Sequence, residues 1–259
     1  MLHQAIIDTL RDSMLPERFD KLQAATVDRM RGLTVVLESL YDPGNQAAVF
    51  RTADAHGLMD VHVIKPENAT KTNARAVSRG AEKWLDIHTY SESTPCIERL
   101  KSQGFQIAVS DLEAASPLET LDFSKPTAIV FGSERFGVSD EMRAAADLRF
   151  KIPMHGFVES FNISVAAAIT LHTARRRRER ALGAMTDIHE DERLAVLARW
   201  MRRSVTDSEA QLLEAGIHVP PLPDIMTWNE RRDKGRKKKR LDVEPAIGIP
   251  RSEMRGRRD

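Results

Sequence analysis

The sequence predicts an α/β protein built on a mostly parallel β-sheet with flanking helices. Between residues 33 and 180, short runs rich in β-branched residues alternate with helical patterns that end at glycine or at a polar turn. The chain has 259 residues, of which 41% are hydrophobic, so it is long enough to bury a sizeable core. Its single cysteine, Cys96, excludes a disulfide within the chain. Because strands and helices alternate, a parallel sheet is the simplest arrangement.

The first part of the chain predicts a helix followed by four strands and two further helices. Proline is favoured at the first position of a helix, so a helix of about 15 residues is expected to begin at Pro16. Gly57 and Gly104 are placed to end the two later helices. In order, the predicted elements are a strand at 33–37, a helix at 46–56, strands at 61–64 and 85–89, a helix at 95–103 and a strand at 106–109.

The second part continues the alternation and ends in helices. A strand at 127–131 precedes a helix at 140–146 with Ser139 as its N-cap, and a strand at 149–152 precedes a long helix at 162–180. Two further helices are expected at 190–203 and 208–215. This pattern predicts four segments: an N-terminal helical segment at 1–32, the α/β domain at 33–180, a helical extension at 181–230 and a basic tail at 231–259.

Charge is sorted along the chain. Residues 231–259 hold 12 Lys and Arg against 5 Asp and Glu, a net charge of +7, whereas residues 1–230 hold 27 against 33, a net charge of −6. A second basic run occupies residues 175–178. Such blocks are typical of proteins that contact a polyanion, most often a nucleic acid, although a solvated tail or an exposed helix end would look the same.

Several protein classes are excluded. The longest apolar runs are far shorter than the roughly 20 residues that a membrane span requires. The first residues show no basic cluster followed by an apolar stretch, so a cytoplasmic protein is expected. A single cysteine and eight histidines without His-x-x-x-His spacing give no pattern for a metal site.

Three segments carry more glycine and polar residues than packing requires. Residues 42–53 lead from a strand into a helix, where Asn45 is a candidate cap and Arg51 lies further along. Residues 130–139 form a loop with glycine at both ends, but its spacing matches neither phosphate-binding glycine motif. Residues 152–168 place Ser160, Asn162 and Ser164 at the start of a helix, whose free N–H groups can hold a polar ligand. Each segment alone is equally consistent with a cap, a surface side chain or an ordinary loop.

In this order and at these spacings, the three segments together resemble the motifs of the SpoU branch of the SPOUT RNA methyltransferases. The resemblance covers roughly residues 30–180 and is strongest to the bacterial tRNA guanosine-18 2′-O-methyltransferases. It implies an α/β fold whose C-terminal part is threaded into a deep trefoil knot, which is a rare exception to the rule that chains avoid knots. It also implies a homodimer with the active site at the subunit interface.

The resemblance implies S-adenosylmethionine as the methyl donor and transfer to the ribose 2′-hydroxyl of guanosine 18 in the tRNA D-loop. By position, the family's cofactor-binding residues correspond to Ser110, Gly132, Ile152 and Phe161. Phe161 stands where the family usually has leucine, so a main-chain contact would survive while the wall of the pocket changes.

The family pattern places the essential residues at Asn45, Arg51, Glu134, Ser160 and Asn162. The family proposal makes Arg51 a general base, but a guanidinium in a protein is normally held protonated. Arg51 is therefore expected to bind the RNA phosphate and to polarise the 2′-hydroxyl, and whether it also takes the proton is left open. Asn45 would hold Arg51 or the ribose. Glu134 and Asn162 would tie two loops together and orient the substrate, with support from Ser160.

Basic side chains are expected to supply phosphate contacts, which give affinity without sequence information. The candidates outside the tail are Lys21, Arg29, Arg175, Arg176 and Arg178. Two alternatives share the motifs: 2′-O-methylation of another tRNA position or of ribosomal RNA, and a non-catalytic RNA-binding protein. Many ribosomal-RNA members carry a longer N-terminal domain than the 32 or so residues found here, which favours tRNA.

Overall fold

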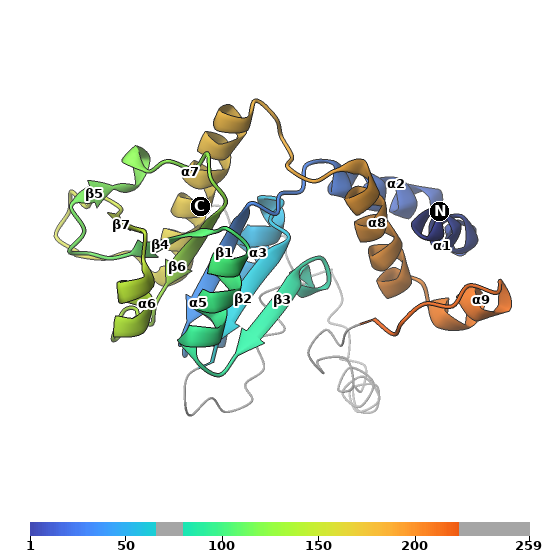
Figure 1. Cartoon of the computed structure of the whole chain (residues 1–259), viewed down its shortest axis with the longest axis horizontal. Helices are drawn as coiled ribbons and strands as arrows, with labels where there is room; N and C mark the ends of the chain where they lie inside the picture. Colours follow the sequence, from blue (N-terminus) through green and yellow to red (C-terminus); the bar gives the residue numbers. More distant parts are fainter. Residues whose placement is uncertain (66–79, 223–259) are drawn as a thin grey trace, which may run out of the picture. The chain divides into compact units, whose positions relative to one another are not determined.

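A mostly buried parallel sheet forms the centre of the protein (Figure 1). The structure is a computed structural model that describes residues 1–65 and 80–222. Within these residues the sheet has seven strands in the order β3-β2-β1-β6-β4-β7-β5, and all of its strand pairs are parallel. The predicted fold class is therefore confirmed. The strands are β1 (Leu33–Glu38), β2 (Asp60–Ile64), β3 (Asp86–Tyr90), β4 (Gln106–Ser110), β5 (Ser116–Pro117), β6 (Thr127–Phe131) and β7 (Leu148–Lys151).

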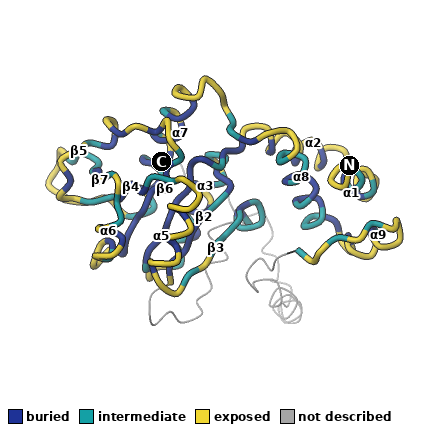
Figure 2. The backbone as a smooth tube through the Cα atoms, viewed as in Figure 1, coloured by how far each residue is buried: buried dark blue, intermediate teal, exposed yellow. Residues whose placement is uncertain are grey.

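Helices cover both faces of the sheet. On one face, α3 (Pro43–Ala55) and α7 (Ile163–Leu182) pack over strand residues such as Val35 and Ile129. On the other face, α5 (Ser93–Ser102) and α6 (Asp140–Ala145) pack over residues such as Val36 and Val130. Figure 2 shows the consequence: the central strands are buried while the helices expose their outer surfaces. Strands buried on both faces explain the continuous apolar runs in the sequence.

A second hydrophobic core joins the two ends of the described chain. Helices α1 (Leu2–Arg11) and α2 (Pro16–Val27) pack against α8 (Glu190–Ser204), and α1 also contacts α9 (Ser208–Glu214). Leu10, Phe19 and Trp200 are buried in this core. The prediction missed α1 and the two-residue strand β5, along with two single-turn 3-10 helices at Ala81–Lys83 and Leu118–Thr120.

The other predicted elements are present, with small shifts at their ends. Pro16 begins α2 as expected, and Ser139 caps α6, with its hydroxyl accepting from the N–H of Met142. Helix α3 begins three residues earlier than predicted, and its N-cap is Asp42, whose side chain accepts from the N–H of Gly44 at 2.7 Å. The interpretation of Asn45 as the cap is therefore wrong, because Asn45 lies inside the first turn of α3.

Two predictions stay open after the fold is described. The trefoil knot implied by the family resemblance stays a prediction, and so does the division into four segments. The basic tail at residues 231–259 lies outside the described residues. Among the helices that the structure describes, none is both long and apolar enough to cross a membrane.

Candidate active site

Three of the predicted catalytic residues meet at the C-terminal edge of the sheet. Strands β1 and β6 are neighbours, with Leu37 opposite Phe131, so the segments that follow them emerge side by side. The side-chain amide of Asn45 donates to Glu134 Oε1 at 2.6 Å, and the amide of Asn162 donates to Asn45 Oδ1 at 3.2 Å. The contacts join residues 89 and 117 positions apart in the sequence. Ligands bind at this edge in open α/β sheets.

The hydrogen bonds have a fixed direction. Asn162 is the N-cap of α7, and its Oδ1 accepts from the N–H of Ser164 at 2.9 Å and from the Ser164 hydroxyl at 2.6 Å. The amide NH2 of Asn162 is therefore left to donate to Asn45, which in turn donates to Glu134. The chain ends on a carboxylate whose second oxygen can accept a hydrogen bond from a ligand.

The loop that presents Glu134 is closed on itself. The N–H of Ser133 donates to the Gly137 carbonyl, and the N–H of Gly137 donates to the Ser133 carbonyl, both at 2.9 Å. Gly137 has a φ of +69°, which favours glycine. At Gly132, a Cβ would lie 2.0 Å from the carbonyl carbon of Gly137, so only glycine fits there. The glycines thus have a structural role, and Glu134 stands at the exposed tip.

Arg51 lies on the exposed surface of α3, about one and two-thirds turns beyond Asn45. Its guanidinium makes no hydrogen bond or ion pair with residues 1–65 or 80–222. Ser160 is exposed in the segment between β7 and α7, and within the same ranges its hydroxyl also forms no hydrogen bond. The structure therefore joins Asn45, Glu134 and Asn162, and leaves Arg51 and Ser160 without a direct link to them.

The predicted cofactor-binding residues lie along the same edge. Ser110 is the last residue of β4, Gly132 follows β6 directly, and Ile152 follows β7 directly; these three strands are adjacent in the sheet. Phe161 precedes the N-cap of α7 and is 40% exposed. No charged side chain occupies any of these four positions, so they fit a ligand held through main-chain and apolar contacts.

Comparison with known proteins agrees with this arrangement. Residues 32–172, more than half of the chain, match the SpoU rRNA Methylase family. The chain belongs to the SpoU methylase family. A curated relative, the tRNA (guanosine(18)-2'-O)-methyltransferase of Thermus thermophilus, is 39% identical over 178 residues, which cover 68% of this chain and 91% of that protein.

Solved structures of similar proteins share the fold. The A. aeolicus TrmH/SpoU tRNA modifying enzyme superposes with a TM-score of 0.66 at 30% identity, covering 74% of this chain and 98% of that chain. The AdoMet-bound rRNA methyltransferase from Sinorhizobium meliloti superposes with a TM-score of 0.51 at 27% identity, covering 56% of each chain. One neighbour is thus named for tRNA and the other for ribosomal RNA.

The prediction that Arg29, Arg175 and Arg178 contact RNA is wrong, because all three are buried at 5% exposure or less. Arg29 pairs with Asp54 at 2.7 Å and lies over the ring of Trp200. Arg175 pairs with the buried carboxylate of Glu179 at 2.7 Å. Guanidinium groups that are buried and already paired cannot reach a phosphate.

The guanidinium of Arg178 is held by several partners within the protein. It pairs with Asp187 at 2.9 Å and donates to the main-chain carbonyls of Phe123, Ser124 and Lys125. Lys21 and Arg176, by contrast, are exposed, so their contact with RNA stays a prediction.

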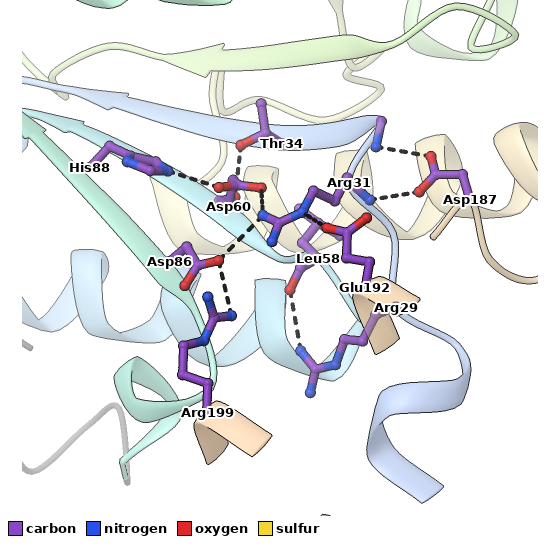
Figure 3. Close-up of polar contacts among 11 residues, drawn as sticks. Arg29, Arg31, Thr34, Leu58, Asp60, Asp86, His88, Asp187, Glu192 and Arg199 are labelled. Atoms are coloured by element: carbon purple, nitrogen blue, oxygen red, sulfur yellow. Dashed lines mark hydrogen bonds and ion pairs between the residues drawn. The ribbon is translucent and has the colours of Figure 1, made fainter. Parts of the chain in front are cut away.

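Further charged residues lie together at the N-terminal ends of the strands, opposite the candidate active site (Figure 3). Arg31 pairs with Asp60 at 2.6 Å and with Asp86 at 3.3 Å, and it also donates to Glu192 of α8. Figure 3 shows Arg199, also from α8, directed at Asp86. These ion pairs attach helix α8 to the start of β2 and β3, so Arg31 and Arg199 support the fold and lie away from the candidate active site.

Two hydrogen-bonded carboxylates near the site, Glu38 and Asp111, were not found from the sequence. Asp111, next to Ser110, accepts from Arg143 at 2.7 Å and from Arg149, which ties β4 to α6 and β7. Burial alone would raise the pKa of Asp111, but the hydrogen bonds from Arg149 and from the N–H of Glu113, together with the charges of Arg149 and Arg143, outweigh it, so the pKa is lowered. Glu38 ends β1 and accepts from Ser93 and Ser139. The signal for Glu38 was an acidic residue at the end of an apolar strand.

Proposed function

We propose that this protein transfers the methyl group of S-adenosylmethionine to the ribose 2′-hydroxyl of guanosine 18 in the tRNA D-loop. The observation that carries the proposal is the hydrogen-bonded set Asn45, Glu134 and Asn162 at the ligand-binding edge of a SpoU fold. The name of the Thermus thermophilus relative, which the chain covers over 91% of its length, supports the tRNA target.

The chemistry requires alignment and charge stabilisation. When bound, S-adenosylmethionine would supply a methyl group on a positively charged sulfur. The 2′-oxygen would bond to the methyl carbon while the sulfur–carbon bond breaks with its electron pair left on sulfur, and the hydroxyl proton would pass to water. The protein therefore has to hold the ribose in line and favour the developing charge on the oxygen.

Each residue of the predicted catalytic set has its own role in this proposal. Arg51, exposed on α3, binds an RNA phosphate and polarises the 2′-hydroxyl without giving up its own proton. Asn45 fixes the direction of Glu134, whose remaining acceptor capacity orients the ribose. Asn162 connects the start of α7 to this pair, and Ser160 lies two residues before it.

We also propose a homodimer. Phe157, Val158 and Val165 are exposed apolar side chains near the start of α7, and Phe161 lies among them in the sequence. Neighbouring apolar side chains of this kind are typical of a surface that another protein covers. Their nearness in sequence to Ser160 and Asn162 supports a dimer whose interface adjoins the active site.

Methyl transfer from labelled S-adenosylmethionine to unmodified tRNA transcripts tests the function. Nuclease digestion should locate the label on the ribose of guanosine 18, and a transcript with adenosine at position 18 serves as the control. Label at another tRNA position, or only on ribosomal RNA, would contradict the proposed target while keeping the reaction. Transfer to none of these RNAs would contradict the proposed function as a whole.

A further inference from the structure

Glu38 is a buried carboxylate that the proposed mechanism does not use. It is the last residue of β1 and is 3% exposed. Its Oε1 accepts from the hydroxyls of Ser93 and Ser139, the latter at 2.7 Å, and its Oε2 accepts from the main-chain N–H of Ser139 at 2.8 Å. Within the described parts of the chain, no cation forms an ion pair with Glu38. Burying a charged carboxylate costs free energy unless hydrogen bonds compensate for the lost water. For Glu38, uncharged donors from two other segments supply those hydrogen bonds.

Ser139, which makes two hydrogen bonds to Glu38, is the last residue of the loop that carries Glu134. The Ser139 hydroxyl and the Ser139 N–H both donate to Glu38. The same hydroxyl accepts from the N–H of Met142 at 3.1 Å, so Ser139 is also the N-cap of α6. At its other end, the loop follows Phe131, which pairs with Leu37 of β1. Both ends of the loop are therefore attached to the last two residues of β1.

The same strand also leads to Asn45. Only six residues separate Glu38 from Asn45, and Asp42 caps helix α3 between them. Strand β1 is thus the common support of the two residues that must meet, Asn45 through α3 and Glu134 through the loop. Ser93 adds the start of α5 to the same carboxylate.

We propose that Glu38 is a positioning residue: by holding Ser139, it keeps Glu134 at the distance from Asn45 that methyl transfer requires. The inference rests on the proposed function. It gives Glu38 no contact with the substrate, so its loss should affect the rate of the reaction more than the binding of tRNA.

The test compares Glu38→Gln with Thr34→Val. Thr34 is buried four residues earlier on the same face of β1, and its hydroxyl donates to the Asp60 carbonyl at 2.7 Å, away from the loop. Glu38→Gln places an NH2 group against at least one of the donors of Ser139 or Ser93. Its kcat should fall about 10- to 100-fold with KM for tRNA nearly unchanged, whereas Thr34→Val should keep kcat within about twofold. Unchanged kcat in Glu38→Gln, or an equal loss in both variants, would overturn the proposal.

Ser139 gives a second route to the same answer should Glu38→Gln fold poorly. Ser139→Ala removes the hydroxyl that Glu38 accepts from, and Ser139→Thr keeps a hydroxyl. Loss of kcat in the first variant and its recovery in the second are expected. Equal kcat values in Ser139→Ala and Ser139→Thr would contradict the role of this contact.

Hydrogen exchange separates this inference from the proposed function. In Glu38→Gln, deuterium uptake by the peptide covering residues 132–139 should rise above that of the unchanged protein, and Thr34→Val should not show this rise. If the unchanged protein methylates no RNA, the proposed function fails, and uptake alone then decides the inference: faster exchange confined to Glu38→Gln supports it, and equal exchange in the two variants overturns it.

Discussion

The side-chain amide of Asn45 lies 2.6 Å from the carboxylate of Glu134 and donates to it, which joins helix α3 to the loop after β6. Asn45 also accepts from Asn162, so it is the middle member of the chain. A middle member that donates to one neighbour and accepts from the other cannot be replaced by a residue that only accepts. This asymmetry can be tested by exchanging the donor and the acceptor.

Asn45→Asp should lower kcat about 100-fold, because two carboxylates would face each other where one hydrogen bond now stands. The double substitution Asn45→Asp with Glu134→Gln restores a donor and an acceptor while keeping the bond from Asn162. It should recover kcat to within about tenfold of the unchanged enzyme. Steady-state methylation of the tRNA transcript measures both. A double variant as slow as Asn45→Asp alone would mean that the negative charge has to stand at position 134 itself.

Arg51→Ala should lower kcat by about two to three orders of magnitude, because it removes the charge that stabilises the reacting oxygen. Affinity for S-adenosylmethionine, measured by calorimetry, should stay nearly unchanged, since the expected cofactor positions lie at the ends of β4, β6 and β7. Arg99→Ala, which removes another exposed arginine from α5 on the opposite face of the sheet, is the matched control. Full activity in Arg51→Ala would remove Arg51 from the catalytic set.

The sequence predicted the sheet from local patterns, and the family resemblance placed Asn45, Glu134 and Asn162 in one set of essential residues. It did not predict that Asn45 joins the other two, because Asn45 was expected to hold Arg51 or the ribose. Apolar runs such as β6 are readable wherever a strand is buried on both faces. The start of α3 was misplaced because two neighbouring polar residues, Asp42 and Asn45, both qualify as caps. Only the backbone geometry decides between them.

The roles of the arginines were not predictable from the sequence, for a different reason. In the run at residues 175–178, Arg175 and Arg178 are buried while Arg176 between them is exposed, although all four residues are arginine. Arg178 is buried because Asp187 and the carbonyl of Phe123, 55 residues away, satisfy its guanidinium. Partners of this kind are tertiary contacts, so a basic run read alone overestimates the surface available to RNA.

The two neighbours Arg176 and Arg178 should therefore respond differently to alanine. Arg178→Ala should destabilise the protein by about 3 kcal/mol, because it removes the buried guanidinium that pairs with Asp187 and donates to three main-chain carbonyls. Arg176→Ala should change stability by less than about 1 kcal/mol, because its side chain is 54% exposed, and should weaken tRNA binding at low salt. Urea unfolding and filter binding measure the two effects. Weaker tRNA binding by Arg178→Ala, without loss of stability, would return Arg178 to the RNA-binding surface.

Stability should fall when the pH drops below neutrality, because burial lowers the pKa of His62 to about 4 and the nearby His88 acts in the same direction. The unfolded chain binds a proton at its ordinary pKa of about 6.5, so protonation favours the unfolded state as the pH falls from about 6.5 toward 4. Burial also lowers the pKa of His56, which adds to the effect with the same sign.

The loss attributable to His62 between pH 7 and pH 5 should be about 2 kcal/mol, measured as the free energy of unfolding in urea. His62→Gln removes the titrating ring, which stacks on His88 and lies 3.0 Å from the Tyr90 hydroxyl. The variant will be less stable at pH 7, yet its stability should change less between the two pH values, since its folded and unfolded states no longer differ in proton binding at this position. The change in unfolding free energy with pH therefore separates the titration of His62 from its packing. An identical pH dependence in both proteins would show that the folded and unfolded states do not differ in proton binding at His62. Other groups would then set the acid sensitivity.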